Sequence, residues 1–286
     1  MDPTSLDVRA NGLVHHVLAW PSRTEGVSGT VLLVHGFADA AATWDLVAPT
    51  LAGKGLRVFA PDMRGFGRAP RAGAGGSYHF VDYVADLADI VDALSPDASV
   101  SLVGHSMGGV ISTLFAGSFP ERVGKLAVLE GLGPPDNAFE VGPLRMRRWI
   151  EGTRSMQTRS EKAFTRTEAL QRLVANHQGV DPSILEHRLL HLVDEVGEGL
   201  VRWRFDPLHR TTSPMPFFAA LFREFARKVA CPTLAVSGGP SGYHPPGEEE
   251  RLAAFPSLRQ LTIKDAGHMM HWTRPSEVAA ALVAFL

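Results

Sequence analysis

Short apolar runs alternate with segments of helical periodicity along most of this chain, and the alternation restricts the possible folds more than any other feature. An uninterrupted apolar run of about four to eight residues is typical of a strand buried on both faces of a parallel sheet. Five short segments rich in apolar residues are predicted strands, at 30–34, 56–60, 99–103, 125–129 and 232–236, and the resumed alternation predicts another at 258–263. Helical spacing appears between and after them at 44–52, 80–94, 107–119, 248–254 and 275–286. The pattern predicts an α/β fold with a mostly parallel central sheet flanked by helices.

Two regions depart from this alternation. Asn11-Gly12 lies between two strand-like segments and predicts a hairpin, because both residues tolerate positive φ. Residues 134–229 are punctuated by prolines and show helical patterns without strand-like apolar runs. We therefore expect 1–133 and 230–286 to form one core. With the two strands of the hairpin counted first, 134–229 is a helical cap inserted between the sixth strand (125–129) and the seventh (232–236).

The pentapeptide Gly104-His105-Ser106-Met107-Gly108 lies between a predicted strand and a predicted helix. A sharp strand-to-helix turn of this kind leaves no room for Cβ atoms on either side of the central residue, so it requires glycines there. The turn would lift the Ser106 hydroxyl above the sheet edge, beside the N–H groups at the start of the helix. This context predicts that Ser106 is a catalytic nucleophile.

Three further motifs follow predicted strands: His35-Gly36-Phe37, Asp62-Met63-Arg64-Gly65-Phe66-Gly67 and Gly267-His268. Together with Gly104 to Gly109, and in this order, they resemble the α/β-hydrolase fold family over nearly the whole chain. The resemblance implies an oxyanion loop at the first motif, a D-x-R-G-x-G loop at the second and the catalytic histidine at the third. We expect Asp62 and Arg64 to brace their loop rather than to take part in catalysis.

A serine hydroxyl is a weak nucleophile near neutral pH, so a base must remove its proton during attack. His268 is the predicted base, because it follows the nucleophile in the order Ser, acid, His, and the small Ala266-Gly267 pair lets its loop reach the sheet edge. The chain has 12 histidines. The others weighed for this role are His35, His105, His244 and His271.

A catalytic triad also needs an acid that holds the histidine. Here this chain departs from the commoner pattern of the family, which places an aspartate after the seventh strand. Ser241 stands at that point, and no carboxylate follows before Glu248. Some relatives, certain haloalkane dehalogenases among them, place the acid after the sixth strand, where this chain has Glu130. We therefore predict that Glu130 accepts the Nδ1–H of His268. Asp265 remains the alternative acid.

Attack on a carbonyl creates an oxyanion, which needs preorganised donors. The backbone N–H groups of Phe37 and Met107 are the expected pair. Bulky apolar residues in 134–229 and beside the catalytic histidine favour an apolar substrate pocket, and we expect Trp149, Phe217 and Met269 to line it.

Composition excludes several classes of protein. The formal net charge is −2, so no overall positive field would attract nucleic acid or anionic lipid. The single cysteine, Cys231, excludes an internal disulfide and a site of several thiolates. No apolar stretch of 18 residues and no secretory signal are apparent. We expect a cytoplasmic protein without metal, cofactor, nucleic-acid partner or membrane insertion; its oligomeric state is left open.

These features favour a cofactor-independent serine hydrolase with an acyl-enzyme on Ser106, acting on small to medium carboxylic esters with an apolar portion. Thioesterase, lactonase, aminopeptidase, acyltransferase and C–C bond hydrolase activities fit the same residues. A ligand-binding protein that keeps the fold but turns over slowly is the alternative of a different class. Serine at the strand-to-helix turn (the nucleophile elbow) disfavours epoxide hydrolase and dehalogenase chemistry, which in this family needs aspartate at that position.

Overall fold

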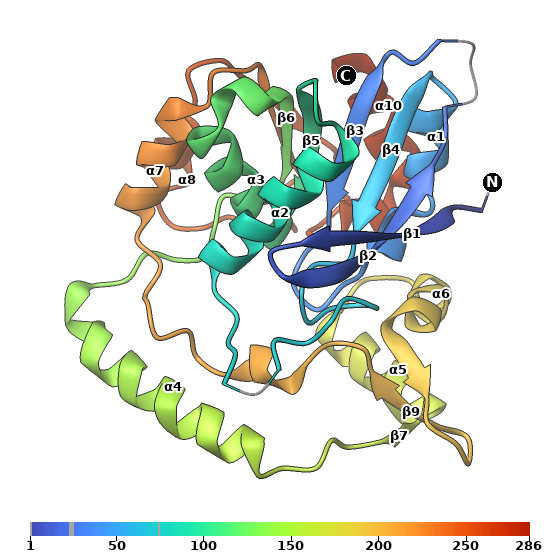
Figure 1. The fold of residues 1–286 in the computed structure, drawn as a ribbon, viewed down its shortest axis with the longest axis vertical. Coiled ribbons are helices and arrows are strands. Elements are labelled where there is room, and N and C mark those ends of the chain that lie inside the picture. Colours follow the sequence, from blue (N-terminus) through green and yellow to red (C-terminus); the bar gives the residue numbers. More distant parts are fainter. Residues whose placement is uncertain (1, 23–25, 74) are drawn as a thin grey trace.

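The computed structural model describes residues 2–22, 26–73 and 75–286, and a mixed sheet of eight strands organises them (Figure 1). The strand order is β1-β2-β4-β3-β5-β6-β10-β11. The first two strands and their junction with β4 are antiparallel, and the rest of the sheet is parallel. The strands are β1 (Thr4–Ala10), β2 (Leu13–Trp20), β3 (Gly29–Val34), β4 (Leu56–Pro61), β5 (Val100–His105), β6 (Val123–Leu129), β10 (Thr233–Ser237) and β11 (Leu258–Thr262).

The predicted hairpin is confirmed at the start of the chain. Asn11 and Gly12 have φ angles of 47° and 75°, and Ala10 pairs with Leu13 across the turn. Two consecutive positive φ angles match the right-handed twist of the flanking strands, which is why Asn-Gly is favoured there.

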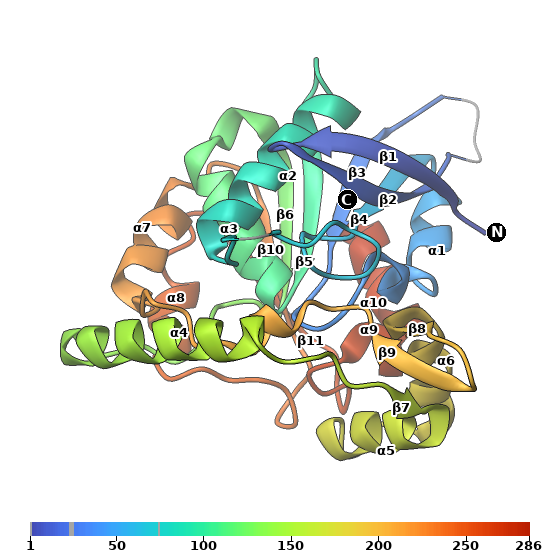
Figure 2. The same ribbon diagram turned by 60° about the horizontal axis from the view of Figure 1, so that its bottom comes forward.

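Helices cover both faces of the sheet, as the alternation predicts. In β3, Leu32 and Val34 face one core cluster and Val31 and Leu33 the other, so the strand is buried on both sides. The first cluster includes residues of α2 (Phe80–Leu94), α3 (Met107–Ser118) and α7 (Ala219–Lys228). The second includes residues of α1 (Ala48–Ala52), α9 (Met270–Thr273) and α10 (Pro275–Phe285). Figure 2 shows the two layers on opposite sides of the strands.

Two residues of α2 depart from the rule that apolar side chains are buried and charged ones exposed. Val81 is 72% exposed, whereas Asp86 is fully buried. The Arg64 guanidinium donates to both Asp86 oxygens, at 2.6 Å from Nε, so the carboxylate is paired inside the protein. Arg64 therefore ties the loop after β4 to α2, in keeping with the bracing role expected of it.

Residues 134–229 extend from the carboxyl end of β6 and return to the sheet at β10 (Figures 1 and 2). Contrary to the all-helical expectation, this segment also contains a small sheet of order β7-β9-β8. Strands of two to four residues have no periodicity that a sequence pattern could reveal. The segment comprises η3 (Phe139–Val141), α4 (Gly142–Gln157), β7 (Phe164–Thr165), α5 (Arg166–Asn176), α6 (Pro182–Leu192), β8 (Val193–Glu195), β9 (Leu200–Trp203), η4 (Pro207–Arg210) and α7.

The last helix of this segment packs with the core. A Cβ on Gly117 of α3 would lie 2.3 Å from the carbonyl oxygen of Phe225 in α7, so the two helices approach closely. Phe222 and Ala226 of the same helix belong to the core cluster on this face of the sheet. The division into 1–133, 134–229 and 230–286 stays a prediction, and by packing α7 goes with the core. Within the part of the chain that the structure describes, no helix has the length and apolar character needed to cross a membrane.

Candidate active site

Ser106 occupies the strained turn between β5 and α3. Its φ and ψ are 51° and −117°, a conformation that a residue with a side chain rarely adopts. A Cβ on Gly104 would lie 2.3 Å from the carbonyl oxygen of Gly108, and a Cβ on Gly108 would lie 2.2 Å from that of Val34. Both flanking positions are therefore restricted to glycine by contact with backbone, for the reason that the motif suggests.

The carboxylate of Glu130 lies beside the imidazole of His268. The distance from His268 Nδ1 to Glu130 Oε2 is 3.0 Å. Glu130 also accepts hydrogen bonds from the backbone N–H groups of Gly238, at 2.6 Å, and Tyr243. A Cβ on Gly242 would lie 1.9 Å from Glu130 Oε1, so the loop after β10 encloses the carboxylate.

These contacts decide the charge of Glu130. Burial by itself raises the pKa of the carboxyl, but the hydrogen bonds from His268 and the two backbone N–H groups outweigh it and leave the pKa below its ordinary value of 4.5. The side chain is therefore an anion at neutral pH and can hold His268 as the Nδ1–H tautomer, which leaves Nε2 free to act as a base.

Asp265, the alternative acid, lies in a different setting. It is exposed, with a positive φ of 54° in the loop that leads to the catalytic histidine candidate, and no hydrogen bond joins it to His268. The hydrogen-bond geometry therefore favours Glu130 over Asp265 as the acid.

The other histidines weighed as bases have partners of their own. His271 is fully buried, with Nε2 at 2.9 Å from the hydroxyl of Thr43. His244 pairs with Glu248 at 2.8 Å. His35 accepts the Met63 N–H at its Nε2, at 3.0 Å. These contacts place the three rings in supporting roles.

His105 contributes more than the sequence suggests. It is buried, and its Nε2 donates a hydrogen bond to the backbone carbonyl oxygen of His268 at 2.8 Å. Burial keeps the pKa of His105 well below its usual value, so the ring is neutral and has a single N–H to donate. The residue before the candidate nucleophile thus holds the loop of the candidate base.

A cavity of about 370 Å³ opens onto Ser106 and His268. Phe37, Met107 and Trp149 line it as well, so two expected oxyanion residues and one expected substrate contact share it. The remaining lining residues are Gly76, Ser77, Tyr78, His79, Phe80, Tyr83, Val110, Glu130, Gly133, Pro134, Thr153, Leu208, His209, Thr211, Ser213 and Tyr243.

A second cavity, of about 670 Å³, reaches the same serine and histidine from the side of α5. Met269 lines this cavity and not the first. Phe217 lines neither: its ring lies against Gly133, 5.9 Å from the ring centre of Phe222. The expected apolar contacts are therefore divided between two cavities, and Phe217 packs the inserted segment onto the core.

His209 lines the first cavity, and no sequence signal indicated it. Its ring lies between those of Phe66 and Tyr78, with both centroid distances 3.8 Å, and its Nδ1 is 3.2 Å from the Tyr83 hydroxyl. Burial lowers the pKa of His209 to about 4. The neutral imidazole of His209, in η4, therefore packs the inserted segment against the loop after β4.

This burial predicts a pH-dependent stability. Between pH 6.5 and about 4 the unfolded chain protonates His209 but the folded protein does not. The free energy of unfolding should therefore decrease as the pH is lowered through this window, by about 3 kcal/mol from this residue. His209→Gln should show a shallower fall across this window in urea unfolding. Equal slopes for the two proteins would contradict the prediction. The other buried histidines contribute equally to the pH dependence of the wild type and of His209→Gln, so they cancel in the comparison.

The comparisons with known proteins agree with this architecture. The model of the alpha/beta hydrolase fold family matches residues 29–275. The chain belongs to the α/β-hydrolase fold family. A serine hydrolase-like protein of Dictyostelium discoideum is 26% identical, over 99% of this chain and 79% of its own. Epoxide hydrolase A of Mycobacterium tuberculosis is 27% identical, over 99% and 97%.

Solved structures of this fold superpose closely. A thioesterase domain from the curacin biosynthetic pathway has a TM-score of 0.81 at 23% identity, covering 99% of this chain and 100% of that one. At this identity the likeness shows the fold alone. Members of the family thus carry out different hydrolytic reactions. Which of these reactions this chain catalyses has to be inferred from the side chains at its site.

Proposed function

We propose that this α/β hydrolase cleaves carboxylic esters through an acyl-enzyme on Ser106. The observation that carries the proposal is the 3.0 Å hydrogen bond between His268 and the buried Glu130, at a cavity that Ser106 also lines. Serine at the elbow supports acyl transfer over epoxide opening, because an acyl-serine can be hydrolysed with the same base that formed it.

In the first half of the reaction, His268 Nε2 removes the proton of the Ser106 hydroxyl as its oxygen attacks the ester carbonyl. The backbone N–H groups of Phe37 and Met107 would stabilise the resulting oxyanion. The C–O bond to the alcohol then breaks, and the alcohol leaves with the proton from His268. Throughout, the Glu130 carboxylate stabilises the transient imidazolium and keeps the ring oriented.

In the second half, water replaces the alcohol. His268 accepts a proton from the water as it attacks the acyl carbonyl, and the same oxyanion donors act again. The bond from the acyl carbon to Ser106 breaks, the serine oxygen regains the proton from His268, and the carboxylic acid is released. Apart from the ester and the water, each step uses only groups of this chain.

The two cavities suggest the shape of the substrate. The first is rich in aromatic side chains and suits an apolar arm. The second has two exposed arginines in its lining, Arg172 and Arg210, whose guanidinium groups lie 4.3 Å and 5.0 Å from the ring centres of Phe164 and Phe205. An acidic arm of the substrate would find its counter-charge there.

We expect a half-ester of a dicarboxylic acid to be a better substrate than a neutral ester of the same length. Because exposed ion pairs contribute about 0.2–1 kcal/mol, Arg172→Gln should raise KM for the half-ester by about 1.5- to 5-fold and leave the neutral ester unchanged. Arg166→Gln, at the start of the same helix, is the matched control. Equal effects on both esters would remove the acidic arm from the proposal.

The function itself is tested with a panel of nitrophenyl esters graded by acyl length, beside thioesters, lactones and an aminoacyl amide. We expect turnover of esters above the Ser106→Ala background, with a preference for a medium apolar acyl chain. Turnover confined to thioesters, lactones or the amide would reassign the reaction within acyl transfer. A response at the Ser106→Ala level for every substrate would overturn the proposal.

A further inference from the structure

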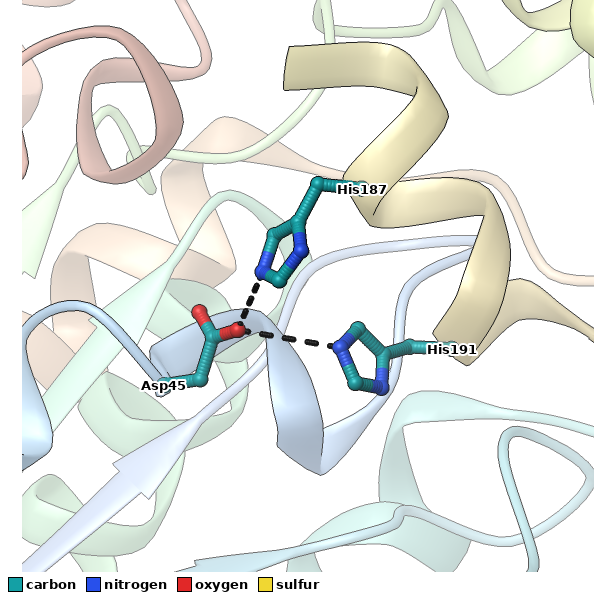
Figure 3. Close-up of side chains that lie close together, drawn as sticks. All are labelled: Asp45, His187 and His191. Atoms are coloured by element: carbon teal, nitrogen blue, oxygen red, sulfur yellow. Dashed lines mark hydrogen bonds and ion pairs between the residues drawn. The ribbon is translucent and has the colours of Figure 1, made fainter. Parts of the chain in front are cut away.

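Asp45, His187 and His191 bring three potential metal ligands together outside both cavities (Figure 3). The two histidines are four residues apart on α6 and therefore share a face of that helix. Asp45 follows η1 (Ala41–Trp44), which precedes α1 in the core. One ligand atom from each of the three residues lies within 4.8 Å of the other two.

The distances from the two histidines to Asp45 are close to those between ligands of one metal ion. The Nε2 atoms of His187 and His191 lie 2.7 Å and 3.7 Å from the same oxygen, Asp45 Oδ2. Ligand atoms about 2.0–2.1 Å from a tetrahedral zinc ion are about 3.3 Å from one another, between these two values. Small side-chain rotations would therefore suffice to place an ion among the three.

His191 gives a second reason to expect a ligand. Its Nε2 is buried and has no hydrogen-bond partner among the described residues, because 3.7 Å from Asp45 is too long for a hydrogen bond. A ring nitrogen that faces a carboxylate without bonding to it is costly unless something else occupies the space between them.

We propose that Asp45, His187 and His191 form a binding site for a divalent transition-metal ion of the zinc type. Two imidazole nitrogens and one carboxylate oxygen make a donor set that zinc accepts. The three side chains are 23–44% exposed, so water can supply a fourth ligand and the ion can enter from solvent.

Arg188 both orients this site and limits its affinity. Its buried guanidinium donates from Nη2 to both oxygens of Asp45, at 2.7 Å and 2.9 Å. Carboxylates that bind metals are commonly held by such outer hydrogen bonds, which fix their orientation. The positive charge of Arg188 opposes a cation nearby, so we expect moderate rather than very tight binding.

An ion in this position would tie the inserted segment to the core. It would join α6 to the short segment between η1 and α1, which Arg188 already contacts through the carbonyl oxygens of Ala42 and Thr43. Binding to the folded state alone raises its stability, so the midpoint of thermal unfolding should rise with metal concentration.

The test uses the full chain without an affinity tag, stripped with a chelator and titrated with zinc chloride by calorimetry. We expect one ion per chain, visible d–d absorption when cobalt(II) replaces zinc, and a higher unfolding midpoint. His187→Ala should weaken binding by at least about tenfold. Glu186→Ala, an exposed neighbour on the same helix, should bind as the wild type does.

His187 is exposed on α6, so its replacement should leave the fold intact, which far-ultraviolet circular dichroism can verify. Asp45→Asn provides a second variant of nearly the same shape and should also weaken binding. Absence of zinc binding by the wild type would overturn the proposal. Binding that is unchanged in both His187→Ala and Asp45→Asn would overturn it too. The outcome is independent of whether Ser106 hydrolyses esters.

Discussion

Replacing Ser106 with alanine should lower kcat for ester hydrolysis by on the order of 10⁶-fold, because no acyl-enzyme can form and the remaining groups act only on bound water. The variant should fold normally: alanine keeps the Cβ at this turn, and within the described residues the serine hydroxyl makes no capping hydrogen bond to α3. The change is measured with the best nitrophenyl ester of the panel, against enzyme-free hydrolysis.

A phosphonate probe gives an independent reading of the same residue. Intact-protein mass measurement should show one adduct on the folded wild type and none on Ser106→Ala. Labelling of the wild type after denaturation should be lost, since the hydroxyl is reactive only beside its base. A folded wild type that is not labelled would remove the claim that this serine is activated, whatever its residual turnover.

Glu130→Gln should lower kcat on the order of 10⁴-fold with little change in KM. The amide is nearly the same size as the carboxylate, but it carries no charge to stabilise the imidazolium. Its NH₂ group would also face the His268 nitrogen that needs an acceptor, so the ring would be held in the wrong tautomer. The loss should appear in kcat because the contact acts on the transition state.

Asp265→Asn is the matched control for this change. Asp265 is exposed and makes no hydrogen bond to His268, so we expect turnover close to that of the wild type. Near wild-type turnover for Glu130→Gln together with a large loss for Asp265→Asn would reverse the assignment of the acid. Circular dichroism should confirm that Glu130→Gln is folded, because the carboxylate also accepts the N–H groups of Gly238 and Tyr243.

Most of the fold could be predicted because its signals are local. The hairpin follows from the positive φ tolerated by Asn11 and Gly12, and the central strands β3, β5 and β6 follow from apolar runs that are mostly buried. The three small strands after residue 163 were missed for the converse reason, since two to four residues carry no period. The exposure of Val81 has no sequence signal either, because an apolar side chain on a helix can also face solvent.

The candidate site divides in the same way. The sequence by itself determined the position of Ser106, because only glycines fit the backbone contacts on either side of that turn. It also indicated Glu130 and His268, by their places at strand ends. That these two side chains meet at 3.0 Å was decided only by the tertiary structure, through the loop after β10 that encloses the carboxylate.

Other features have no sequence signal at all, because they join residues that are far apart in the chain. His209 lines the first cavity and lies against Phe66 and Tyr78, although more than 100 residues of sequence separate it from either. Asp45 contacts His187 across a separation of 142 residues. The division of apolar contacts between two cavities likewise depends on how the inserted segment folds back over the sheet. Short-range backbone geometry determines the nucleophile turn, whereas long-range packing decides what surrounds it, and only the folded chain brings such distant residues together.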